Sequence, residues 1–199
     1  MKVTAKKERH MERPTVWDTD IEQFLTPQRV LVVQIIQSAL AVGALAFLAV
    51  VFYLYQSRAG LIPTPADQER SLIESLSVMN VILGLAFYGA TAFLDRVSLT
   101  KLGLVRPAGS QASSGPLDPV QKIYSSVLAG FLVRWALMEA SSIFGLVVCL
   151  LAITSGVAYS DEIVLLNILP AIVFIFFTIM RFVNREELLS LMQAQARNE

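Results

Sequence analysis

The chain has 199 residues, of which 55% are hydrophobic, and its sixteen basic and sixteen acidic side chains give a formal net charge of zero. Basic and aromatic residues are not interleaved as they are on nucleic-acid-binding surfaces, so no nucleic-acid partner is expected. The single cysteine, Cys149, excludes an internal disulfide and is interpreted as a small apolar filler.

Residues 1–26 are rich in charge and are predicted to form a cytoplasmic N-terminal tail. The pair Thr26-Pro27 is typical of a helix start, because threonine caps the first turn and proline is tolerated at the first helical position. An apolar run with only three polar interruptions predicts a first membrane helix over residues 30–55. The run is too long for the core of a cleavable signal peptide, so we expect it to remain as a signal anchor.

Three further apolar runs predict membrane helices at about residues 76–94, 127–154 and 163–182. Each run approaches or exceeds the roughly 18–20 apolar residues that cross a hydrocarbon core about 30 Å thick. A soluble fold would leave too little polar helix to cover four helices that are apolar all round. The sequence therefore predicts an all-α protein, a four-transmembrane-helix bundle of two helical hairpins, with residues 27–183 as its transmembrane domain.

Positive charge is concentrated on one side of the predicted spans. Thirteen of the sixteen Lys and Arg residues fall before the first apolar run, in the loop between the second and third runs, or at the C-terminal end. Only Arg58 and Arg70 fall on the other side. Because cytoplasmic loops carry an excess of Lys and Arg, both termini are predicted to be cytoplasmic, in the cell inner membrane. The opposite orientation is the alternative.

Residues 184–199 are predicted to form a cytoplasmic helical extension of the fourth helix. Leucine and methionine side chains recur there at the spacing of one helical face. Such a stripe is typical of a helix that lies on a membrane surface or packs against a partner. The residues expected to make this contact are Leu188, Leu191 and Met192.

Glu139 requires a functional explanation, because it places an acid inside the third run. A charged side chain at depth costs roughly 2.5–3.5 kcal/mol on insertion scales, and it should face the bundle interior, paired or protonated. Arg134 lies about 140° around the same helix and is interpreted as an interfacial anchor. Gln37 or Arg181 is therefore the expected hydrogen-bond partner. Three roles are open for the acid: a structural contact that fixes helix register, a carrier of protons or ions, and a contact with another subunit.

The stretch Arg134-Trp-Ala-Leu-Met-Glu139, followed by Ile143-Phe-Gly-Leu-Val147, resembles a motif that opens the third helix of small four-helix bacterial membrane proteins of unknown function. This resemblance implies the fold and no activity. The same stretch is similar to the carboxylate helix of rotary ATPase proteolipids, which implies that Glu139 carries an ion. The chain departs from that family because it lacks a glycine-rich first helix in each hairpin, places its acid on the first helix of its hairpin instead of the second, and has longer tails and loops.

No set of residues typical of catalysis or metal binding is present, and His10 has no second histidine or cysteine near it. The chain is predicted not to be an enzyme and to use no cofactor. We expect an accessory or structural subunit of a larger bacterial membrane complex, with lipids and other membrane protein subunits as partners. The alternative is a proton- or ion-translocating proteolipid that uses Glu139.

Overall fold

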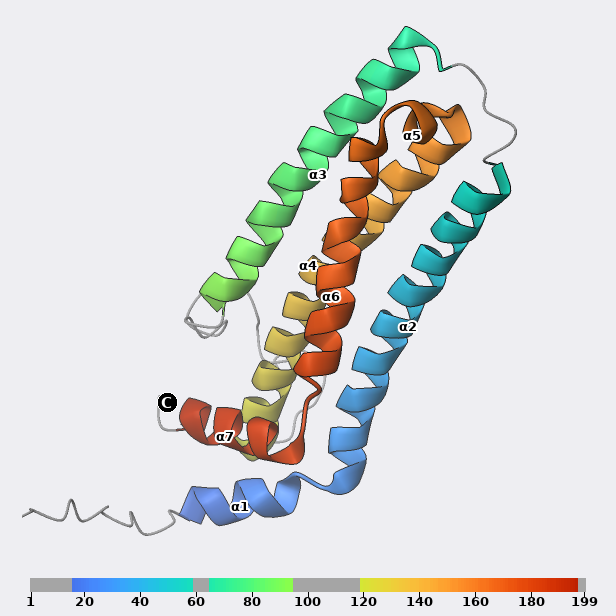
Figure 1. The fold of residues 1–199 in the computed structure, drawn as a ribbon. Helices are drawn as coiled ribbons and strands as arrows, with labels where there is room; N and C mark the ends of the chain where they lie inside the picture. The colour runs from blue at the N-terminus through green and yellow to red at the C-terminus, as the bar shows by residue number, and fades with distance from the viewer. Residues whose placement is uncertain (1–15, 59–64, 95–118, 197–199) are drawn as a thin grey trace, which may run out of the picture.

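The computed structural model describes residues 16–58, 65–94 and 119–196, and every regular element in these ranges is a helix (Figure 1). Four segments are long and apolar enough to cross a membrane, which makes the chain a multi-pass membrane protein, as predicted. The four segments are α2 (Pro27–Arg58), α3 (Asp67–Leu94), α4 (Pro119–Ser155), and η1 (Glu162–Ile168) continued by α6 (Leu169–Met180).

The first two spans begin several residues before their apolar runs, and hydrogen bonds define their first turns. At the start of α2, the carbonyl oxygen of Thr26 accepts hydrogen bonds from the backbone N–H groups of Arg29 and Val30. At the start of α3, the side chain of Glu69 accepts a hydrogen bond of 3.1 Å from the backbone N–H of Ala66. The acidic first turn of α3 also complements the positive end of the helix dipole.

Helix α4 is the centre of the bundle. Half of its most apolar stretch is buried, compared with 17% for α2 and for α3. Helices α2, α3 and α6 all pack directly against α4. The remaining apolar faces of α2 and α3 are exposed, as is required of surfaces that meet lipid tails.

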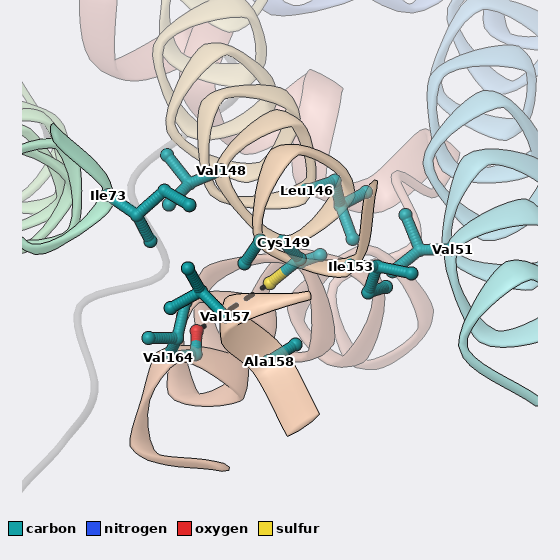
Figure 2. Packing of buried hydrophobic residues seen from close by; sticks show 11 residues of the cluster. Val51, Ile73, Leu146, Val148, Cys149, Ile153, Val157, Ala158 and Val164 are labelled. Carbon is teal, nitrogen blue, oxygen red and sulfur yellow. Dashed lines mark hydrogen bonds between the residues drawn. The ribbon is translucent and has the colours of Figure 1, made fainter. Parts of the chain in front are cut away.

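Helices α2 and α3 lie on opposite sides of α4, although they are consecutive in the chain (Figures 1 and 2). The main contacts of α2 are with α4 and α6, whereas those of α3 are with α4 and η1. The two helices of the first predicted hairpin therefore pack mainly against the second hairpin and not against each other. The second half of the chain forms a packed hairpin, and that hairpin separates the two helices of the first half.

The fourth span is broken where a 3₁₀ segment meets an α-helix. The side chain of Asp161 accepts a hydrogen bond of 3.1 Å from the backbone N–H of Ile163 and so starts η1. Pro170 stands in the first turn of α6, where a missing N–H is tolerated. The helix ends at Arg181, whose backbone is no longer helical. The chain then turns, and α7 (Arg185–Ala196) crosses the base of the bundle instead of extending the fourth helix (Figure 1).

A short helix, α1 (Val16–Phe24), lies across the same end of the bundle as α7 and packs against it (Figure 1). The contacts of α7 with α1 and with the first turns of α4 bury Leu188 and Met192 completely, whereas Leu191 remains 40% exposed. Arg185 donates hydrogen bonds to the carbonyl oxygens of Glu22 and Leu25. A guanidinium group is favourable there, because it meets free carbonyls at the negative end of α1.

The opposite end of the bundle closes around α5 (Val157–Ser160), which follows a turn at Gly156 with a φ of 83°. Tyr159 stacks on Tyr55 of α2 and donates a hydrogen bond of 2.8 Å to its carbonyl oxygen. Burial raises the pKa of the Tyr159 phenol. Figure 2 shows the apolar cluster below, in which Cys149 is fully buried and directs its thiol at the carbonyl of Val164.

Candidate functional site

Two asparagines form the centre of a polar seam between α3, α4 and the broken fourth span. Asn80 Nδ2 donates a hydrogen bond of 2.8 Å to Asn167 Oδ1. Asn167 Nδ2 donates in turn to Ser77 Oγ and to the carbonyl oxygen of Val164, both at 2.8 Å. The two asparagines are 2% and 5% exposed, so this network lies in an apolar environment. No bulk water is present there to take over its hydrogen bonds. The seam therefore fixes the register of α3 against η1.

The carbonyl oxygen of Pro170 continues the seam towards the middle of the bundle. It accepts hydrogen bonds of 3.1 Å from Tyr88 Oη on α3 and from Ser142 Oγ on α4, whose single hydroxyl proton is shared with the carbonyl oxygen of Met138 at 2.8 Å. The Pro170 oxygen has two lone pairs, so it accommodates both donors. Helices α3 and α4 thus bond to the fourth span at the point where that span is irregular. Hydrogen bonds from neighbouring helices allow a membrane protein to tolerate such a break in a helix.

Two glycines bring the helices of the seam close together. A methyl group on Gly145 would overlap the carbonyl oxygen of Asn167 and would stand 2.9 Å from Asn80 Nδ2. A methyl group on Gly84 would stand 3.4 Å from Ser141 Oγ, which is an ordinary contact. Glycine is therefore a steric requirement at residue 145 and not at residue 84.

Three buried polar atoms have no hydrogen-bond partner among the residues that the structure describes. They are Asn80 Oδ1, Ser141 Oγ and Trp135 Nε1. Ser141 differs in this respect from its neighbour Ser142, which donates to the carbonyl oxygen of Met138 four residues earlier. The Ser141 hydroxyl is thus directed at α3, towards Gly84, and is not used within its own helix.

Gln37 forms a second polar lock, at the end of the bundle covered by α1 and α7. Its Nε2 atom donates to the carbonyl oxygens of Thr178 and Arg181, at 3.1 and 2.9 Å. Its Oε1 atom accepts from the backbone N–H of Val183 at 3.1 Å. Gln34 adds a bond of 2.9 Å to the carbonyl of Val183. The two glutamines thus hold the backbone of the turn between α6 and α7.

Glu139 is not part of either lock. It is half-buried on the flank of α4, and none of the hydrogen bonds or ion pairs among the described residues involves its carboxylate. Gln37, the expected partner, is fully engaged with the backbone of α6 and the following turn. Leu132 and Leu146 share this flank, because residues seven apart on a helix lie on one face. Leu146 is fully buried and Leu132 is 40% exposed. Glu139 therefore lies between a part of α4 that the neighbouring helices bury and a part that they leave exposed.

The two arginines of the predicted cluster are placed differently from each other. Arg134 is half-buried on α4, whereas Arg181 is exposed, with its guanidinium 6.0 Å from the centroid of the Phe177 ring. Arg181 does meet Gln37, through its carbonyl oxygen and not through its charge. No group of three metal-ligating side chains occurs in the described part of the chain.

Comparisons with known proteins identify no relative: no family model, no curated protein and no solved structure matches the chain.

The apolar runs place Asn80 and Asn167 in the outer halves of their spans, but the sequence did not predict that the two side chains bond. The available signal was their comparable depth in two spans that run in the same direction, since isolated polar groups in a membrane tend to pair. The sequence contains no signal for the close contact at Gly145 or for the Pro170 carbonyl as an acceptor, because both depend on where the backbone lies.

Proposed function

We propose that this chain is a non-catalytic integral membrane protein, an accessory or structural subunit of a larger membrane complex. The observation that supports this proposal is the use of its intramembrane polar groups. The side chains of Gln37, Asn80 and Asn167 bond to neighbouring helices of the same chain. Such groups rigidify the bundle, and a rigid bundle with broad exposed apolar faces is suited to packing beside other membrane subunits.

We further propose that both ends of the chain are cytoplasmic and that the host membrane is a bacterial inner membrane. The strong asymmetry of Lys and Arg supports the orientation. The packing of α1 and α7 at one end also agrees with it, because both helices then lie on the side that carries the positive charge. The resemblance around residues 134–147 to small bacterial membrane proteins supports the choice of membrane.

The second candidate function is a proton- or ion-translocating proteolipid. Its supporting observation is the Glu139 carboxylate, which the described residues leave without a hydrogen bond and which is therefore available to bind a proton or an ion. Such a role requires Glu139 itself, so that Glu139→Gln and Glu139→Leu abolish transport equally. A structural role tolerates Glu139→Gln, because the amide keeps the shape and the polarity of the side chain.

The native mass of the protein after gentle detergent extraction separates the two functions. A subunit should be recovered with different chains in a fixed stoichiometry. A large ring built from copies of this chain alone would support the proteolipid and contradict the first proposal.

A further inference from the structure

The outward face of α4 beside Glu139 combines small residues with an acid inside the span. It carries two small residues one turn apart, Ala136 and Ala140, both of which are exposed. Small residues at this spacing allow the backbone of a second helix to approach closely in a membrane. The surrounding apolar residues are Leu132, Ile143 and Val147.

Glu139 borders this face and supplies its only acid. It follows Ala136 by three residues and precedes Ile143 by four, so its side chain lies along the edge of the same face. Counted along α4, Glu139 is sixteen residues before Ser155, a distance of about 24 Å at 1.5 Å per residue. It therefore lies among the apolar residues of the span, where an acid is costly unless another group neutralises it or bonds to it.

Charge decides what kind of chain can cover this face. A second copy, paired about a two-fold axis along α4, would place its own Glu139 near the first, since such an interface joins the same patch on both subunits. Two carboxylates in apolar surroundings repel each other strongly. A transmembrane helix with an Arg or Lys at the same depth would form an ion pair with Glu139, and each charge would then be neutralised by the other.

We propose that the outward face of α4, from Leu132 to Val147, docks one transmembrane helix of a different subunit, and that an Arg or Lys of that helix pairs with Glu139. This inference rests on the proposed function and names the contact through which the chain joins its complex.

The test uses the full-length chain in its native membrane, with a photo-crosslinking residue at Ala140. The matched control carries the crosslinker at Leu85, which is on the exposed face of α3 and is 73% exposed. We expect Ala140 to capture a second protein whose crosslinked segment is a transmembrane helix containing Arg or Lys. Leu85 should yield lipid adducts only.

Variants of Glu139 then test the charge pair. Glu139→Leu should lower the yield of the Ala140 adduct by at least about tenfold, because the basic group of the partner loses its counter-charge. Glu74→Leu, which removes an exposed acid near the start of α3, should leave the yield unchanged. Replacing the captured Arg or Lys by Leu should reduce the adduct as Glu139→Leu does, and Glu139→Gln should give an intermediate yield from a chain of unaltered fold.

Three results would overturn the inference: an adduct between two copies of this chain, lipid adducts alone at Ala140, or a protein adduct that is insensitive to Glu139→Leu. If the native mass still shows different chains in fixed stoichiometry, only the assignment of this face fails. If no other chain accompanies the protein, the proposed function fails with it.

Discussion

Asn80 on α3 and Asn167 in η1 are 87 residues apart in the chain and join their side-chain amides by a hydrogen bond of 2.8 Å. Neither asparagine is more than 5% exposed. The bond therefore couples the second span to the irregular part of the fourth in apolar surroundings.

Replacing Asn80 by Leu should destabilise the bundle. The change removes the bond to Asn167 and leaves Asn167 Oδ1 without that donor in an apolar environment. Interhelical hydrogen bonds in membranes contribute about 0.6 kcal/mol on average and up to about 1.7 kcal/mol, and the free energy of unfolding should fall by an amount in this range or above it. Denaturant titration in detergent measures the loss. Met79→Leu, at the exposed neighbouring position, is the control and should change little.

Gly145→Ala should be among the most damaging single substitutions in the chain. The added methyl group overlaps the carbonyl oxygen of Asn167, a backbone atom that moves only if the helices separate. Overpacking of this kind costs typically about 1–3 kcal/mol. The yield of monodisperse protein and the Tm should both fall. Gly43→Ala is the matched control, because no atom outside its own helix lies within 4 Å of the new methyl, and its Tm should be equal or slightly higher. An equal response to both substitutions would contradict the close approach of α4 to η1.

Gly84→Ser should be more stable than Gly84→Ala. Both add a carbon 3.4 Å from Ser141 Oγ, and the serine also brings a hydroxyl within bonding distance of that unpartnered atom. The gain of one hydrogen bond is about 0.5–1.5 kcal/mol. Intrinsic helix propensity affects this comparison, so the same pair of variants is also measured with Ser141→Ala. The advantage of serine should disappear there, and an advantage that persists would show that Ser141 is not the partner.

Gln37→Leu should loosen the turn between α6 and α7. The substitution removes three hydrogen bonds to the backbone of Thr178, Arg181 and Val183. Buried backbone groups left without partners cost about 1–3 kcal/mol each, so the last helix should separate from the base more often. Limited trypsin digestion should then cleave faster after Arg185. Gln28→Leu, an exposed glutamine on the same helix, provides the control.

The orientation is tested with cysteines at the two ends of the bundle. Gln68→Cys, at the start of α3, should react with a membrane-impermeant maleimide in intact cells. Ser190→Cys on α7 should react only after permeabilisation. The parent chain is a suitable background, because Cys149 is fully buried. The reverse pattern would place both termini outside the cytoplasm.

The sequence was sufficient to predict the four spans, because long apolar runs have few alternatives in a chain of this size. It did not predict that α2 and α3 lie apart, since hydropathy carries no information on which helices are neighbours. The clustering of Gln37 with Arg181 also has a cause that the sequence does not display. The two residues meet because α6 ends at Arg181 and exposes carbonyl groups, and not because one of them is charged.

The packing of α7 at the base of the bundle is a second feature that the sequence predicted only in part. The stripe that contains Leu188 and Met192 was visible in the sequence, but it is covered by α4 and by α1, and α1 falls in a segment that composition alone had assigned to a tail. Only Leu191 of the predicted contact remains exposed. An amphipathic stripe shows that a helix needs an apolar partner, and it does not distinguish a partner within the same chain from a membrane or a second protein.

The position of α4 between α2 and α3 has a consequence for biogenesis. Synthesis delivers α2 and α3 to the membrane first, yet each finds its main packing surface on α4, α6 or η1, which are translated later. Until then, Asn80 lacks its partner Asn167, and the inward faces of both early helices lack their neighbours. We therefore expect the first half of the nascent chain to remain open until the second hairpin inserts between α2 and α3.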